Sequence, residues 1–131
     1  MRVLVVDDEE GILRILRVML GILGHEAITA GNGRQAIDYL SSNSGAIDTL
    51  LTDLKMPEMN GYVTIREARL IRPDLAVILM SGSLDAAAPK EAVLLPKPFT
   101  LASVSMCLDL AVMKSRQEST RALKLRGKRI A

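Results

Sequence analysis

Aromatic residues are almost absent from this sequence, which has one Phe, two Tyr and no Trp among 131 residues. A core must therefore consist of aliphatic side chains and Met, and 131 residues are enough for one such core. The single cysteine, Cys107, excludes an internal disulfide and is typical of a reducing compartment. No apolar run approaches the roughly 18 residues of a membrane span, and the one after Met1 is too short for a signal peptide. We expect a soluble, cytoplasmic protein without a membrane segment.

The small net charge of +2 hides an uneven distribution along the chain. Residues 1–113 contain ten basic and fourteen acidic side chains, whereas residues 114–131 contain seven basic side chains and one acid, Glu118. This asymmetry predicts two parts, an acidic domain over 1–113 and a basic extension over 114–131.

The basic extension is expected to be either a continuation of the preceding helix or a disordered tail. If helical, it would end near Leu125, because Gly127 is a common helix terminator. A charged segment of this kind suits an acidic partner or nucleic acid. It has no aromatic residues for base stacking and no recognisable DNA-binding module, so sequence-specific DNA binding is not expected.

Short apolar runs alternate with stretches of helical periodicity in the first 113 residues. The runs predict five strands, over 3–6, 26–29, 47–53, 75–80 and 92–95. The periodic stretches predict helices over 12–23, 33–40 and 61–71 and a last helix from Leu101. This alternation predicts an α/β fold with a doubly wound, five-stranded parallel sheet and helices on both faces. The helix between Ser81 and Lys97 is expected to be short or missing, because only fifteen residues separate them.

Four of the five predicted strands end at residues that can carry chemistry. These residues are Asp7 and Asp8, Asp53, Ser81 and Lys97. The carboxyl ends of parallel strands meet at one edge of the sheet, where ligands bind in such folds. Three carboxylates brought together there repel one another unless a cation lies among them, and Mg²⁺ is the cation that best suits such oxygen ligands beside a phosphoryl group. Together with a Lys and a hydroxyl, this set suits phosphoryl transfer to a carboxylate.

Each of these residues also has an ordinary structural explanation. The acids after the first strand can simply favour a helix N-terminus, Asp53 and Ser81 can be turn residues, and Lys97 can be a solvated charge. The combination at four separate strand ends favours the functional interpretation.

Four segments carry a resemblance to a known family over residues 2 to about 113. VLVVDDEE, LLTDLKMPEMNGY, VILMSGS and LLPKPF, in this order, resemble the signature segments of response-regulator receiver domains. The resemblance implies a flavodoxin-like strand order of 2-1-3-4-5 and two-component signal transduction. A sensor histidine kinase or a phosphotransfer protein would phosphorylate Asp53, and the change would act on an output protein that the sequence does not identify. Such a protein catalyses only its own phosphotransfer and dephosphorylation, and is otherwise not an enzyme.

The resemblance also implies a role for each site residue. Asp8 would bind Mg²⁺ directly and Asp7 through a metal-bound water, with the backbone carbonyl of Lys55 as a further ligand beside Asp53. Ser81 would supply the switch hydroxyl. Lys97 would pair with a phosphoryl oxygen, and its bond to the following proline is expected to be cis.

Two features depart from the family pattern. The switch aromatic of the family usually lies three residues before the lysine, where this sequence has Leu94. The shortened segment before the fifth strand is similar to that of receivers attached to hybrid sensor kinases. Both departures affect the usual output face more than the chemistry.

Two other functions are alternatives to the phosphorylation switch. A receiver-fold adaptor would work without phosphorylation through the basic extension, but it would have no chemical reason to keep all five site residues. A Mg²⁺-dependent phosphohydrolase would benefit from an acid two residues after Asp53, where Lys55 stands. The lone His25, between a glycine and a strand, is expected to be a surface or capping residue and not a phosphorelay histidine.

Overall fold

Five short apolar runs form one parallel sheet in the computed structural model, which describes residues 1–82 and 92–130, with side chains as far as residue 127. The strands are β1 (Arg2–Val6), β2 (Glu26–Ala30), β3 (Thr49–Asp53), β4 (Ala76–Ser81) and β5 (Val93–Pro96). Their order in the sheet is β2-β1-β3-β4-β5, as predicted. The helices are α1 (Glu10–Ile22), α2 (Gly33–Ser42), α3 (Gly61–Ile71) and α4 (Leu101–Ile130), with a short 3₁₀ turn, η1 (Ser44–Ala46).

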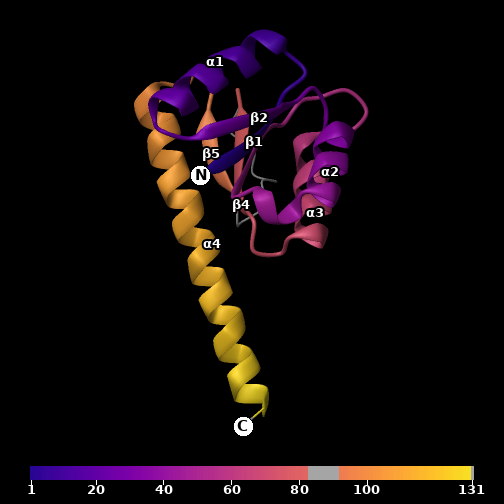
Figure 1. Ribbon diagram of the computed structural model, residues 1–131, viewed down its shortest axis with the longest axis vertical. Coiled ribbons are helices and arrows are strands. Elements are labelled where there is room, and N and C mark those ends of the chain that lie inside the picture. The colour runs from indigo at the N-terminus through magenta and orange to yellow at the C-terminus, as the bar shows by residue number, and fades with distance from the viewer. Residues whose placement is uncertain (83–91, 131) are drawn as a thin grey trace.

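The sheet is covered on both faces, which divides the core into two clusters. Along β1, Val3 and Val5 pack in one cluster, and Leu4 and Val6 pack in the other. Figure 1 shows α1 and α4 on one side of the sheet and α2 and α3 on the other. Since both faces of the central strands β1, β3 and β4 are buried, these strands carry apolar residues on both faces, and this explains their nearly continuous apolar runs.

The predicted elements agree with the observed ones within about two residues, and α3 agrees at both ends. Helix α1 ends before Gly24, which has a φ of +85°, and His25 donates its backbone N–H to the Leu20 carbonyl at 2.8 Å. This is a Schellman-type helix end, as the glycine predicted. The Lys97-Pro98 bond is cis, as expected. The predicted short or missing helix before β5 falls on residues 83–91, which lie outside the described residues.

Helix α4 is longer than predicted, because it does not end at Gly127 but continues to Ile130. Its start is capped reciprocally: Thr100 Oγ1 accepts the Ser103 N–H, and Ser103 Oγ accepts the Thr100 N–H. Beyond the sheet the helix projects away from the domain (Figure 1). Across the described ranges 1–82 and 92–130, no helix combines the length and the apolar character that crossing a bilayer requires.

The loop between β3 and α3 contains a strained residue, Glu58, whose φ is +68°. Met59 N–H donates to the Pro57 carbonyl at 2.7 Å, so that Glu58 is the middle residue of a γ-turn. A side chain with a β-carbon is disfavoured in this left-handed region.

We therefore expect Glu58→Gly to raise the free energy of unfolding by about 0.5–1 kcal/mol, the relief of strain being partly offset by the greater freedom of glycine in the unfolded chain. Urea denaturation measures the change. Glu58→Ala, which keeps the β-carbon, is the matched control and should give no such gain. Equal stabilisation by both variants would mean that the charge of Glu58, and not its backbone, is unfavourable.

Candidate functional site

Three strand ends each add one backbone hydrogen bond beyond the strand, and these bonds fix the residues that follow. Asp7 N–H donates to the Ala30 carbonyl at 3.2 Å, Leu54 N–H to the Met80 carbonyl at 3.1 Å and Lys97 N–H to the Ser81 carbonyl at 2.9 Å. The side chains of Asp7, Asp53 and Lys97 are therefore held by the sheet itself.

The three predicted carboxylates meet at this edge. One oxygen from each of Asp7, Asp8 and Asp53 lies within 4.8 Å of the others. Asp7 and Asp53 are buried, whereas Asp8 is exposed. The neighbouring residues Asp7 and Asp8 thus differ in environment: Asp7 is inaccessible to solvent, and Asp8 is on the surface of the site.

Lys97 joins two of these acids. Its Nζ lies 3.1 Å from Asp53 Oδ1 and 3.6 Å from Asp7 Oδ2. Partial burial lowers the pKa of Lys97, but the hydrogen bond from its ammonium group to Asp53 and the charges of both acids outweigh this, so that its pKa is raised overall. Lys97 is therefore held in its charged form beside the Asp53 carboxylate, where it can also pair with an anionic ligand.

Asp7 has a buried carboxyl in an electrostatically unfavourable environment. Burial raises the pKa of its carboxyl, and the charge of Asp53 adds to the increase, while the Glu9 N–H bond to Oδ1 at 2.9 Å and the charge of Lys97 oppose it. Among the residues that the structure describes, Asp7 Oδ2 is buried without a hydrogen-bond partner, and its one ion pair is with Lys97 Nζ at 3.6 Å. A buried carboxylate oxygen in this condition, beside two other carboxylates, fits a hard divalent cation such as Mg²⁺.

The remaining predicted residues lie around this centre. Ser81, the last residue of β4, is half-buried and pairs in register with Pro96, one residue before Lys97. Lys55 lies two residues after Asp53 with an exposed side chain. Leu94, at the position of the family's switch aromatic, is 36% exposed on β5. Sequence reasoning did not anticipate the contact of Lys97 with Asp7 or the Glu9 N–H that orients Asp7, because neither has a residue signature.

Two further residues of interest lie outside the site. Cys107 is on the buried face of α4, and burial raises the pKa of its thiol. The ring Nδ1 of His25 lies 3.1 Å from the amino group of Met1, and His25 directly precedes β2, at the opposite ends of the strands from the site residues.

A family model for the response regulator receiver domain matches residues 3–100, which is most of the chain. The chain belongs to the response regulator receiver domain family. Its curated relatives include the DNA-binding transcriptional regulator NtrC of Azospirillum brasilense, which is 34% identical over 116 residues, covering 84% of this chain and 24% of that protein. The sensor histidine kinase RcsC of Salmonella typhi is 35% identical over 128 residues, covering 93% of this chain and 13% of the kinase. The receiver thus spans less than a third of the length of these relatives.

Solved receiver structures have the same fold. A receiver domain from Clostridium thermocellum superposes with a TM-score of 0.80 at 34% identity, covering 88% of this chain and 97% of that one. The receiver domain of the hybrid histidine kinase CckA gives a TM-score of 0.75 at 26% identity, covering 86% and 99%. With response regulators and sensor kinases among its relatives, this receiver is a component of two-component signalling.

Proposed function

We propose that Asp53 accepts a phosphoryl group from a sensor histidine kinase or a phosphotransfer protein, and that phosphorylation changes the affinity of the receiver for an output protein. The observation that carries this proposal is the contact of Lys97 Nζ with Asp53 Oδ1 at 3.1 Å inside a cluster of three carboxylates. A carboxylate with one charged donor on one oxygen is placed to react through the other.

The transfer would break the P–N bond of a phosphohistidine and form a P–O bond to Asp53. Asp53 Oδ1 accepts hydrogen bonds from Leu54 N–H at 3.0 Å and from Lys97, so we expect Oδ2 to attack phosphorus. Lys97 would then pair with a phosphoryl oxygen, and Ser81 would donate its hydroxyl to another. Such transfers depend on positioning and on neutralising the equatorial oxygens, which these two residues supply.

The three acids are the residues that would hold Mg²⁺. Asp8 and Asp53 would bind it directly, Asp7 through a water, and the Lys55 carbonyl would complete the protein ligands. When bound, the ion neutralises charge on the phosphoryl oxygens and relieves the repulsion among the acids. Binding also needs the Asp7 carboxyl to be ionised, which its burial opposes.

The signal would leave the site through Ser81 and Lys97, which are joined by the Lys97 N–H to Ser81 carbonyl bond. Because Leu94 replaces the usual aromatic, a rotating ring does not report the phosphorylated state. Instead, phosphorylation would shift a two-state equilibrium through Ser81 and Lys97 themselves. In this proposal residues 1–113 act as the phosphoacceptor domain of a cytoplasmic protein, residues 114–131 are a basic extension, and the only reactions catalysed are the receiver's own phosphorylation and dephosphorylation.

Incubation with a small phosphoryl donor such as acetyl phosphate tests the proposal directly. In the presence of Mg²⁺, the intact mass should rise by one phosphoryl group, and the group should be lost in base, as an acyl phosphate is. Asp53→Asn should take up none, whereas Asp38→Asn, a matched change at an exposed position on α2, should behave as the wild type. Incorporation that survives in Asp53→Asn would place the acceptor elsewhere.

A further inference from the structure

A groove of about 800 Å³ runs along α4 at the amino ends of the strands, whereas Asp53 lies at their carboxyl ends. Met1 and His25, which immediately precede β1 and β2, form one wall. The other wall is α4, from Asp109 to Lys124. Because the groove lies at the amino ends of the strands and the acids lie at the carboxyl ends, a molecule in the groove does not compete with phosphorylation.

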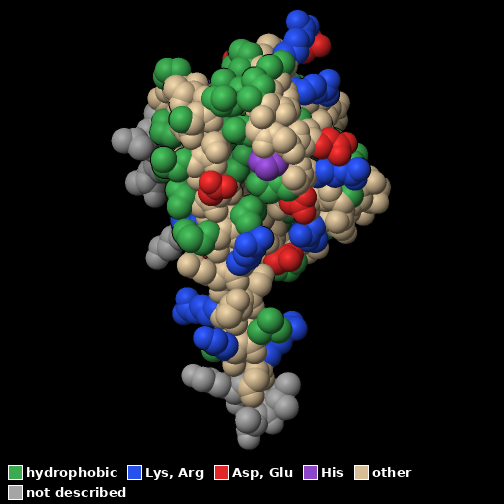
Figure 2. All heavy atoms as spheres, turned by 60° about the vertical axis from the view of Figure 1, so that its left-hand side comes forward, with side chains coloured by type: hydrophobic (Ala, Val, Ile, Leu, Met, Phe, Trp, Pro, Cys, Tyr) green, Lys and Arg blue, Asp and Glu red, His purple; other side chains and the backbone are tan. Residues whose placement is uncertain are grey.

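The groove is apolar at one end and basic at the other. Val112 and the 48% exposed Met113 line the groove together with Met1, and Arg116, Arg121 and Lys124 follow along about the next three turns of α4. Figure 2 shows hydrophobic side chains gathered over the upper part of this face and basic side chains around the projecting part of α4. Asp109 is the only acid among the lining residues, so the groove carries a positive charge.

The three basic side chains of the groove are available to a partner. All three are exposed, and within the described ranges none of them forms an ion pair with an acid of this chain. By contrast, Glu118, the single acid of the extension, is already paired with Arg69 at 3.6 Å. The positive charge is therefore uncompensated on the groove side of the helix.

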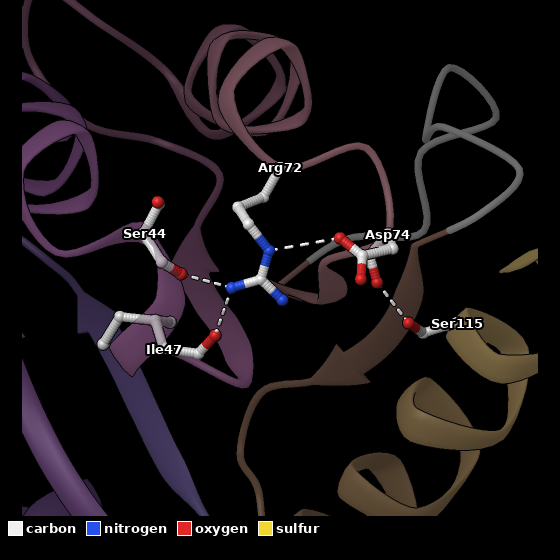
Figure 3. Close-up of polar contacts among 5 residues, drawn as sticks. All are labelled: Ser44, Ile47, Arg72, Asp74 and Ser115. Atoms are coloured by element: carbon white, nitrogen blue, oxygen red, sulfur yellow. Dashed lines mark hydrogen bonds and ion pairs between the residues drawn. The ribbon is translucent and has the colours of Figure 1, made fainter.

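The helix that forms this groove is fixed to the domain by polar contacts on its other side. Ser115 Oγ donates to the Asp74 carbonyl, and Glu118 pairs with Arg69. Figure 3 shows Asp74 bound in turn by Arg72, whose Nε lies 3.1 Å from Asp74 Oδ1 and whose Nη1 donates to the Ser44 and Ile47 carbonyls, the latter at 2.8 Å. α4 thus stays attached well past the end of its apolar core contacts, and its groove side is preorganised for binding.

We propose that this groove binds an acidic, partly apolar segment of a partner protein, such as one amphipathic helix with carboxylates along one face. Apolar side chains of the segment would cover Val112, Met113 and Met1, and its carboxylates would pair with the guanidinium groups of Arg116 and Arg121. Nucleic acid fits less well, because the apolar end offers nothing to a phosphate backbone and no Phe, Tyr or Trp side chain lines the groove for base stacking.

Binding of two acidic probes by the full chain tests the proposal. The first probe is a helical peptide with Leu at positions i, i+3, i+4 and i+7 and Glu elsewhere, and the second is poly-glutamate. We expect calorimetry at low salt to show binding of both and tighter binding of the peptide, with amide NMR shifts at Asp109, Met113 and Arg116. Arg121→Glu should weaken peptide binding by about tenfold or more.

Arg126→Glu is the matched control, because Arg126 is exposed on the same helix but does not line the groove. It should weaken binding by less than threefold if the groove, and not total charge, is what the peptide recognises. Met113→Asp should weaken binding of the peptide more than binding of poly-glutamate. The substitution removes an apolar contact that only the peptide makes, whereas the added negative charge affects both probes. Circular dichroism verifies that each variant keeps its helix.

Any one of four outcomes would overturn the proposal. The first is that neither acidic probe binds. The second is that Arg121→Glu and Arg126→Glu weaken peptide binding equally, and the third is that a short DNA duplex binds more tightly than the peptide. Concentration-dependent dimerisation that Arg121→Glu abolishes would identify a second copy of this chain as the occupant instead, and would equally contradict it. None of these measurements involves Asp53, so the result is independent of the phosphorylation proposal.

Discussion

Replacing Asp7 by asparagine is expected to make the metal-free protein more stable and its phosphorylation at least about 100-fold slower. In the folded protein the Asp7 carboxylate is fully buried near two other acids, and among residues 1–82 and 92–127 Lys97 is the only cation that forms an ion pair with it. Asparagine keeps the oxygen that accepts the Glu9 N–H and removes the charge. We expect a gain on the order of 1 kcal/mol in the free energy of unfolding at neutral pH.

The gain should depend on pH in a definite direction. Burial raises the pKa of the Asp7 carboxyl above its value in the unfolded chain. Between the ordinary carboxyl pKa and the raised value, the folded protein therefore binds a proton that the unfolded chain has lost, and stability falls as the pH rises through this window. Asp7→Asn should remove this fall, so that wild type and variant have similar stability below the window and diverge above it.

Urea denaturation of both proteins across this pH range, with and without Mg²⁺, measures these effects. Mg²⁺ should stabilise the wild type and should have little effect on Asp7→Asn, and the variant should react slowly with acetyl phosphate. Asp38→Asn serves as the control for the loss of one negative charge. If Asp7→Asn destabilised the metal-free protein, the carboxylate would be contributing a favourable interaction that the geometry does not show.

Gly61→Ala is expected to cost about 2–3 kcal/mol of stability and to impair phosphorylation as well. Gly61 begins α3 and lies against the end of β3. A β-carbon there would be 2.4 Å from the Asp53 carbonyl oxygen, 2.8 Å from Leu79 Cδ1 and 3.0 Å from Leu54 Cα. Two of these atoms belong to backbone that cannot rotate away, so the strand end that positions Asp53 must shift.

Gly21→Ala is the matched control for this substitution. Gly21 lies in α1, where an added β-carbon meets nothing within 4 Å, so the change should stabilise the protein by up to about 1 kcal/mol through helix propensity. Thermal unfolding compares the two variants, and acetyl phosphate labelling gives the rate. A Gly61→Ala protein as stable and as reactive as the wild type would show that the contact at Asp53 relaxes at no cost.

The fold and the convergence of the site residues were predictable because both depend on periodicity. Continuous apolar runs such as Val3 to Val6 occur where both faces of a strand are buried, and parallel strands place Asp7, Asp53 and Lys97 at one edge. The sequence pattern does not determine which of two adjacent residues, such as Asp7 and Asp8, is buried. That Asp7 is buried while its neighbour Asp8 is exposed is a property of the folded chain and has no counterpart in the sequence pattern.

Two boundaries show what local patterns miss. Ile47 was predicted to begin β3 because it is apolar, and it is fully buried, but the strand begins at Thr49. The Ile47 carbonyl accepts a hydrogen bond from the Arg72 guanidinium instead of joining the sheet. These two residues are 25 positions apart in the chain. Gly127 was predicted to stop α4, yet a glycine with open space around it costs a helix only about 1 kcal/mol, and the helix continues past it.

The most direct test of the central claim is a titration of beryllofluoride, which mimics an aspartyl phosphate, into the Mg²⁺-loaded protein, followed by amide NMR. If Asp53 is the phosphoacceptor, Mg²⁺-dependent shifts should occur around Asp53, Ser81 and Lys97, and Asp53→Asn should show none of them. If the wild-type spectrum does not change, Asp53 is not a phosphoacceptor, and a phosphorylation-independent adaptor that works through its basic helix becomes the better account of this receiver.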